Sequence, residues 1–165
     1  MEIKKFTQDE VNSTLWRACD TFRGKVDSSI YKDYVLVILF IKYISDIYKE
    51  HKEDLMKKYD NDEEMVQRQL NNDRFVLDEI STFDYIYDRR NQPDVGEVIN
   101  KALAHVEEEN KLKLRGVFKN IDFNSEAVLG NTKERNAMLK HLLEDFAVLD
   151  LRPSRLTGED IIGNA

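Results

Sequence analysis

The stretch "SIYKDYVLVILFIKYISDIYKEH", residues 29–51, is the densest apolar part of this chain of 165 residues. Residues 34–41 carry no charge, and such a run could be a membrane anchor, a buried strand or the middle of a core helix. A membrane-spanning helix needs about 18 or more consecutive apolar residues. Here Lys32 and Asp33 precede the run, and Lys42 and Asp46 follow it. The stretch therefore argues against a membrane span.

The spacing of the apolar residues separates a helix from a strand. On both sides of the run they recur every three or four residues, as expected of a helix, at Ile30, Tyr34, Val37, Ile38, Ile41, Ile44, Ile47 and Tyr48. The next turn signal is Asp-Asn-Asp at 60–62, and Asp27 or Ser28 can supply an N-cap. We predict one helix over about 28–58. It lies in the centre of a bundle, since its middle is apolar all round.

The flanking segments are also predicted to be helical. Thr7 and Glu10 have the spacing of a capping box, and Gly24 can end the helix that follows. Asp94 and Glu97 repeat that spacing before a helix to about residue 109. Asn131 or Thr132 caps a last helix, whose predicted inner face comprises Ala137, Met138, Leu142, Leu143 and Phe146. A short helix is expected over 62–71, segment 73–92 is ambiguous, and 111–131 reads as an irregular connection.

These elements predict an all-α fold: a helical bundle around one long central helix, with irregular connections. Two prolines and six glycines leave little room for a turn-rich β-sandwich. The length fits one domain, which we place at residues 1–156. Its core is predicted to include Leu15, Tyr34, Val37, Ile38, Ile41, Leu142 and Phe146.

Charge and cysteine content narrow the partners and the compartment. With 25 basic and 32 acidic residues, the formal charge is −7, which argues against a wholly electrostatic nucleic-acid binder. A single cysteine, Cys19, excludes an internal disulfide framework and suits a reducing compartment. Acidic residues within positions 1–20 interrupt any signal-peptide core. We expect a cytoplasmic protein.

No catalytic, cofactor-binding or metal-binding residue is predicted. His51, His105 and His141 lie far apart without metal-ligand spacing, and we interpret them as surface or packing residues. Cys19 shares an apolar face with Leu15 and is interpreted as a small buried residue. The sequence contains neither G-x-G nor G-x-x-x-x-G-K, the glycine patterns that cradle phosphates or dinucleotides.

One cluster stands out from the acidic background. In "NKLKLRGVFKN", residues 110–120, four cations occur without an acidic residue among them: Lys111, Lys113, Arg115 and Lys119. They are candidate contacts to DNA phosphate. The alternative is an ordinary solvated connection, anchored by its apolar residues Leu112, Leu114 and Phe118.

Two arginines, Arg152 and Arg155, flank Pro153. They could bind phosphate. Alternatively, they could cap the preceding helix and pair with acidic neighbours such as Glu144 or Asp145.

Two blocks of the sequence carry a family resemblance. The first is Trp16, then Arg23-Gly24, then "DSSIYK" at 27–32 and "LFIKYIS" at 39–45; the second is "LLEDFAVLDLRPSRLTGEDIIGNA" at 142–165. In this order they resemble the N-terminal helical domain of the modification subunit of type I restriction-modification systems. Residues 60–110 match only loosely.

The resemblance implies a larger enzyme than this sequence contains. The family transfers a methyl group from S-adenosylmethionine to adenine N6 in DNA, using a glycine-rich loop and an Asn-Pro-Pro-aromatic motif, and neither is present. We therefore expect a fragment that is not catalytic and holds no cofactor itself. Residues 157–165, with a capping-box pattern at 157–160, would begin the linker or helix leading to a missing methyltransferase domain.

The resemblance also implies partners: duplex DNA, the specificity subunit, a second modification subunit and the restriction subunit, with no membrane. In the family, helical domains help to enclose the DNA. The expected role is an accessory domain that helps to clamp DNA and contacts neighbouring subunits. The alternative is a purely protein–protein docking module without direct DNA contact.

Overall fold

A computed structural model describes residues 7–155, and these residues form helices and connections without a strand. The α-helices are α1 (Gln8–Phe22), α2 (Ser28–Lys58), α3 (Glu63–Leu70), α4 (Phe83–Asp88), α5 (Val95–Glu109), α6 (Lys111–Leu114), α7 (Glu126–Leu129) and α8 (Thr132–Ala147). Two 3-10 turns, η1 (Glu79–Ser81) and η2 (Pro153–Arg155), complete the order. The predicted all-α class is confirmed.

Helix α2 has the predicted bounds. Asp27 is its N-cap, and the Asp27 carboxylate accepts a hydrogen bond from the backbone N–H of Ser29 at 2.8 Å. At the other end, Asp60 and Asn61 take positive φ values of 51° and 61°, a conformation that ends helices. The helix contacts α1, α3, α4 and α8. Its middle is not covered on every side, because Leu36 is 49% exposed.

The first helix also follows the prediction. The backbone N–H of Thr7 donates to the Glu10 carboxylate at 2.8 Å, and the N–H of Glu10 donates to the Thr7 hydroxyl at 3.2 Å. This reciprocal pair is the predicted capping box. After Phe22 the chain turns at Gly24, whose φ of +80° favours glycine.

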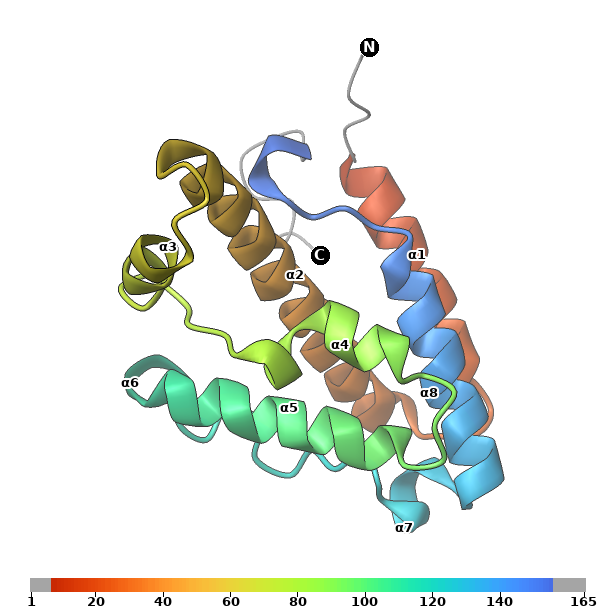
Figure 1. Ribbon diagram of the computed structural model, residues 1–165. Helices are drawn as coiled ribbons and strands as arrows, with labels where there is room; N and C mark the ends of the chain where they lie inside the picture. Colours follow the sequence, from red (N-terminus) through yellow and green to blue (C-terminus); the bar gives the residue numbers. More distant parts are fainter. Residues whose placement is uncertain (1–6, 156–165) are drawn as a thin grey trace.

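Helices α1 and α8 lie side by side and antiparallel at one edge of the molecule, while α5 runs across one end of the bundle (Figure 1). Their apolar faces enclose a single large core together with α2. Of the predicted core residues, Tyr34, Ile38, Ile41, Leu142 and Phe146 are buried. Leu15 and Val37 are only partly buried and pack at its edge.

The inner face of α8 differs from the prediction at one position. Ala137 is exposed, and Leu139 is buried in its place. The buried face of α8 is broad, since the neighbours Met138 and Leu139 are both buried, and Ala137 falls just outside it. Asn131 is the N-cap, accepting from the N–H of Glu134 at 3.0 Å.

The predicted capping box at Asp94 was wrong. Asp94 precedes α5, but its side chain forms no cap hydrogen bond. Its φ of −102° and ψ of 26° place it in a turn, whereas a cap residue is usually extended. Turn hydrogen bonds lead from the end of α4 to the helix, including one from the N–H of Val95 to the Gln92 carbonyl at 3.2 Å.

Two asparagines order the segments whose structure the sequence left irregular. Asn110 accepts from the backbone N–H of Val76 and donates to its carbonyl, each at 2.8 Å. Asn100 accepts from the N–H of Phe123 at 2.9 Å. A Cβ on Gly96 would lie 2.5 Å from the Phe123 carbonyl oxygen, so glycine allows α5 to approach this loop. Asn100 of α5 and its C-cap residue, Asn110, thus hold the two connections.

Candidate functional site

The basic segment, residues 110–120, is a short helical turn followed by a loop. Leu114 and Phe118 are buried and anchor it, whereas Leu112 is fully exposed and anchors nothing. Lys111, Lys113, Arg115 and Lys119 are all exposed. The structure thus leaves the four candidate cations accessible to solvent.

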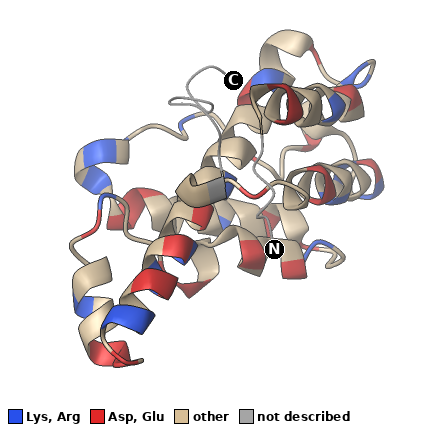
Figure 2. Cartoon of the chain, turned by 90° about the horizontal axis from the view of Figure 1, so that it is seen from above, with Lys and Arg blue, Asp and Glu red and all other residues tan. Residues whose placement is uncertain are grey.

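Acidic neighbours balance part of this charge. Lys111 pairs with Glu108 at 3.0 Å, and Lys113 donates to the backbone carbonyl of Arg74. A cavity beside α6 is lined by three cations, Arg74, Lys111 and Lys113, and by three carboxylates, Asp73, Glu108 and Glu109. Arg115 and Lys119 do not line it, and neither forms an ion pair within residues 7–155. Figure 2 shows acidic and basic residues interspersed over the helices.

The arginine next to Pro153 has partners other than those predicted. Arg152 pairs with Asp150 at 2.6 Å and with Glu53 of α2 at 3.4 Å. The predicted partners are occupied elsewhere: Glu144 pairs with Arg90, and Asp145 with His141. The side chain of Arg155 lies outside the described atoms.

Three carboxylates of α2 hold the segment after α8. Asp46 accepts from the backbone N–H of Leu151 at 2.8 Å, and Glu50 accepts from that of Ser154 at 3.3 Å. With Glu53, they stand at i, i+4 and i+7 on one face of α2. That spacing is visible in the sequence, but the partner segment lies about a hundred positions away and the spacing does not identify it.

A buried ion pair underlies this contact. Lys42 Nζ lies 3.1 Å from Asp46 Oδ1, and the two side chains are 8% and 9% exposed. Burial raises the pKa of Asp46, although Lys42 and the N–H of Leu151 act in the opposite direction. The residue before Asp46 is Ser45, whose hydroxyl accepts a hydrogen bond from the backbone N–H of Phe83 at 2.9 Å. Residues 42–46, "KYISD", therefore join α2 to α4 through Ser45 and to the C-terminal segment through Asp46.

The three histidines contact separate carboxylates. His51 lies 2.5 Å from Asp73, His105 2.5 Å from Asp78, and His141 3.3 Å from Asp145. Within residues 7–155, no group of three or more potential ligands could hold a metal ion. Cys19 is half-buried at the edge of the core rather than fully buried, and burial raises the pKa of its thiol.

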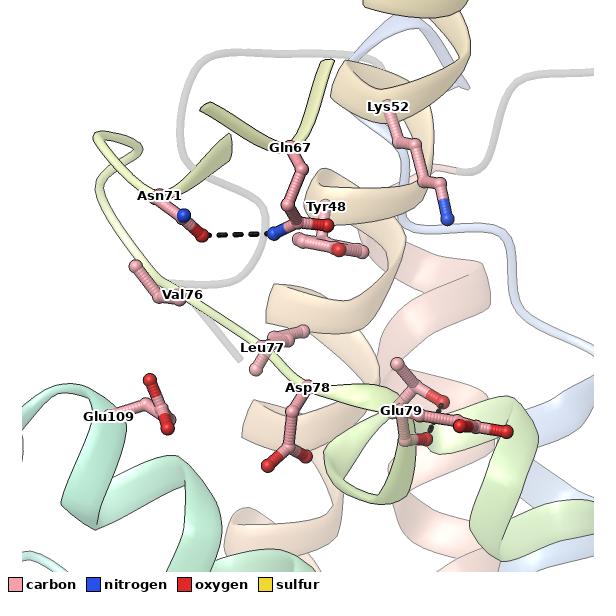
Figure 3. Close-up of a pocket in the computed structure, with 10 residues that line it drawn as sticks. Tyr48, Lys52, Gln67, Asn71, Val76, Leu77, Asp78, Glu79 and Glu109 are labelled. Atoms are coloured by element: carbon pink, nitrogen blue, oxygen red, sulfur yellow. Dashed lines mark hydrogen bonds between the residues drawn. The ribbon is translucent and has the colours of Figure 1, made fainter. Parts of the chain in front are cut away.

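A cavity of about 510 Å³ lies between α2, α3 and η1. Figure 3 shows Tyr48 and Lys52 on one side, Glu109 on the other, and Gln67 bonded to Asn71. Burial raises the pKa of the nearby Asp78, but hydrogen bonds from His105 and Ser81 outweigh it and hold this pKa below its usual value. The Ser81 hydroxyl donates to the backbone carbonyl of Asp78, and the Thr82 hydroxyl donates to that of Glu79. Neither hydroxyl is therefore presented to the imidazole of His105 as a nucleophile.

An apolar groove between α1 and α2 is the feature that sequence reasoning missed. Trp16 is 67% exposed beside it, and Leu36 stands opposite on α2. The groove holds about 340 Å³. Exposed aromatic residues beside an apolar hollow are typical of contact surfaces. The signal was Trp16 itself, a large apolar residue outside the inner face of α1.

Residues 7–155 define an all-helical domain that carries exposed apolar and cationic side chains. No helix described in residues 7–155 is long and apolar enough to cross a membrane. The chain belongs to the HsdM N-terminal domain family, whose sequence pattern matches residues 11–146.

Two curated relatives are methylase subunits of type I restriction enzymes. The chain is 24% identical to the MpnII methylase subunit of Mycoplasma pneumoniae, in a match covering all of this chain and 35% of that protein. It is also 24% identical to the MjaIX methylase subunit of Methanocaldococcus jannaschii, over 68% of this chain and 23% of that protein. The chain thus spans about a third or less of the length of these relatives.

A solved structure shares the fold. The methyltransferase subunit of a type I restriction-modification system from Streptococcus thermophilus superposes with a TM-score of 0.71 at 21% identity. The match covers 96% of this chain and 37% of that one. The predicted family is confirmed.

Proposed function

We propose that this chain is the accessory N-terminal domain of a cytoplasmic DNA adenine-N6 methyltransferase subunit, and that it helps to clamp duplex DNA and contacts neighbouring subunits. Family membership over residues 11–146 is the observation that carries this proposal. The partners would be the specificity subunit, a second modification subunit and the restriction subunit. Phosphate contacts position a protein on DNA without reading its sequence, which suits an accessory role.

Methyl transfer is assigned to the rest of the subunit. The sequence has neither the glycine-rich loop nor the Asn-Pro-Pro motif of that chemistry. The isolated chain should therefore not bind S-adenosylmethionine in a calorimetric titration. A dissociation constant in the micromolar range would place a cofactor site in this domain and contradict the assignment.

The exposed basic segment is the predicted DNA contact, and charge reversal tests it. Lys111, Lys113, Arg115 and Lys119 are changed to Glu in the subunit assembled with its partners, and DNA affinity is measured at two salt concentrations. Each lost phosphate contact should flatten the slope of log affinity against log salt by about 0.9. Weaker binding with a flatter slope and intact assembly is the expected result.

An unchanged slope would remove the segment as a phosphate contact. Because at most four cations take part, the isolated chain should bind DNA only weakly, with a dissociation constant of about 10⁻⁴ M or higher. Within an assembled enzyme the same contacts act at high effective concentration, so weak contacts can still hold a clamp closed.

The second candidate function is a docking module that never touches DNA. The exposed Trp16 favours it, since aromatic residues often anchor protein interfaces. The four-residue variant separates the two functions. If that variant loses its partners in size-exclusion chromatography, the basic segment belongs to a subunit interface instead.

A further inference from the structure

A second cationic surface lies where α1, the turn after it and α8 meet. A cavity of about 400 Å³ there is lined by Arg17, Asp20 and Thr21 of α1, Arg23 and Lys25 of the turn, and His141 of α8. The lining residues of α8 are more than a hundred positions from those of α1, so no run in the sequence marks this surface.

Local structure fixes the shape of the cavity. Gly24, with a φ of +80°, turns the chain so that Arg23 and Lys25 follow directly on α1. The Thr21 hydroxyl is hydrogen-bonded to His141 Nδ1 at 2.7 Å, which fastens α1 to α8 across it. The cavity is therefore walled by two packed helices and by the turn that follows α1.

The cations of this cavity are only lightly engaged. Arg23 pairs with Asp20 at 3.1 Å, but both side chains are more than half exposed, so water screens the pair. Arg17 donates to the Thr14 hydroxyl at 3.2 Å. Lys25 is exposed and forms no ion pair within the described residues. Arg17 also lies close enough to Asp145 for its charge to oppose the rise in that pKa caused by burial. Lys25 is therefore the least engaged of the three cations.

Charge balance separates this cavity from the one beside α6. Three cations and one carboxylate, Asp20, line it, whereas three cations and three carboxylates line the other. The further carboxylate nearby, Asp145, lies behind His141 at 3.3 Å and its side chain is 14% exposed. The α1–α8 cavity is therefore the more positive of the two surfaces.

We propose that the α1–α8 cavity binds phosphate groups of the DNA backbone through Arg17, Arg23 and Lys25. This inference rests on the proposed function and names the surface that faces DNA. Arginine suits such a site because its planar guanidinium can bind two phosphate oxygens at once. The contact is independent of base sequence, as an accessory clamp requires.

The test uses two matched double variants in the subunit assembled with its specificity subunit. Arg17→Glu/Lys25→Glu alters the cavity, and Arg115→Glu/Lys119→Glu makes the same change of charge on the basic segment. Affinity for a duplex is measured across a salt series, and assembly is followed by size-exclusion chromatography. Losing two phosphate contacts should flatten the salt slope by about 2.

Each outcome decides between the surfaces. A flatter slope in the cavity variant supports the proposal, whether or not the segment variant also changes. A flatter slope in the segment variant alone overturns the cavity but keeps DNA clamping. If neither slope changes while assembly persists, the cavity proposal is wrong, and the four-residue variant of the basic segment then decides whether this domain clamps DNA.

A single variant covers the case in which the double variant fails to fold or assemble. Lys25→Glu changes an exposed side chain without an ion pair, so the fold should tolerate it. Its slope should flatten by about 1. An unchanged slope in this assembled variant overturns the proposal.

Discussion

At the scale of residues, the free energy of unfolding depends on the buried ion pair between Lys42 and Asp46. A buried pair gains little over apolar packing, but removing one partner leaves an unpaired buried charge. Lys42→Met should therefore lower the free energy of unfolding by about 3–5 kcal/mol near neutral pH. Urea denaturation measures this loss. Lys49→Met is the matched control, because its pair with Asp84 is more than half exposed on both sides and should contribute at most about 1 kcal/mol.

The pH dependence of this loss has a definite sign. Folding raises the pKa of Asp46, so this group stabilises the folded state at low pH, and that contribution is lost as the pH rises through the folded pKa. Without Lys42 the pKa rises further. The destabilisation by Lys42→Met should thus shrink as the pH falls from about 7 toward about 5. A loss that does not vary with pH would mean that Asp46 does not titrate over this range in the variant, and would contradict the expected rise of its pKa.

At the scale of elements, α2 offers an internal comparison. Ile38 is 1% exposed and Leu36 is 49% exposed on the same helix. Ile38→Asp buries a charge without a partner and should cost more than about 4 kcal/mol, whereas Leu36→Asp should cost about 0.5 kcal/mol. Thermal unfolding of both variants measures the difference. Equal melting temperatures would contradict the described orientation of α2.

Local signals explain which elements the sequence predicted well. The bounds of α2 follow from Asp27 and the turn at 60–62, and the start of α1 follows from its capping box. Segment 73–92 escaped prediction because the contact of Val76 with Asn110 spans more than thirty positions. The partners of Arg152 were missed for the same reason, since Glu53 approaches only in the folded chain.

At the scale of the whole molecule, only part of the candidate site could be predicted from the sequence. The basic segment is contiguous, so the sequence revealed it, although acidic side chains from α5 balance part of its charge. Folding assembles the α1–α8 cavity from Arg17, Lys25 and His141, which no linear pattern groups. The family resemblance identified the domain, but the grouping of cations on its surface depends on how the helices pack.

Photocrosslinking tests DNA contact by this domain most directly. A photoreactive side chain is placed at position 25 in the cavity, at 117 in the basic segment or at 54 on α2, all exposed. Each assembled enzyme is irradiated with duplex DNA bound. We expect crosslinks from position 25 and none from position 54, because α2 carries no residue of either proposed DNA contact. DNA crosslinked from none of the three positions, with methylation intact, would contradict DNA clamping by this domain.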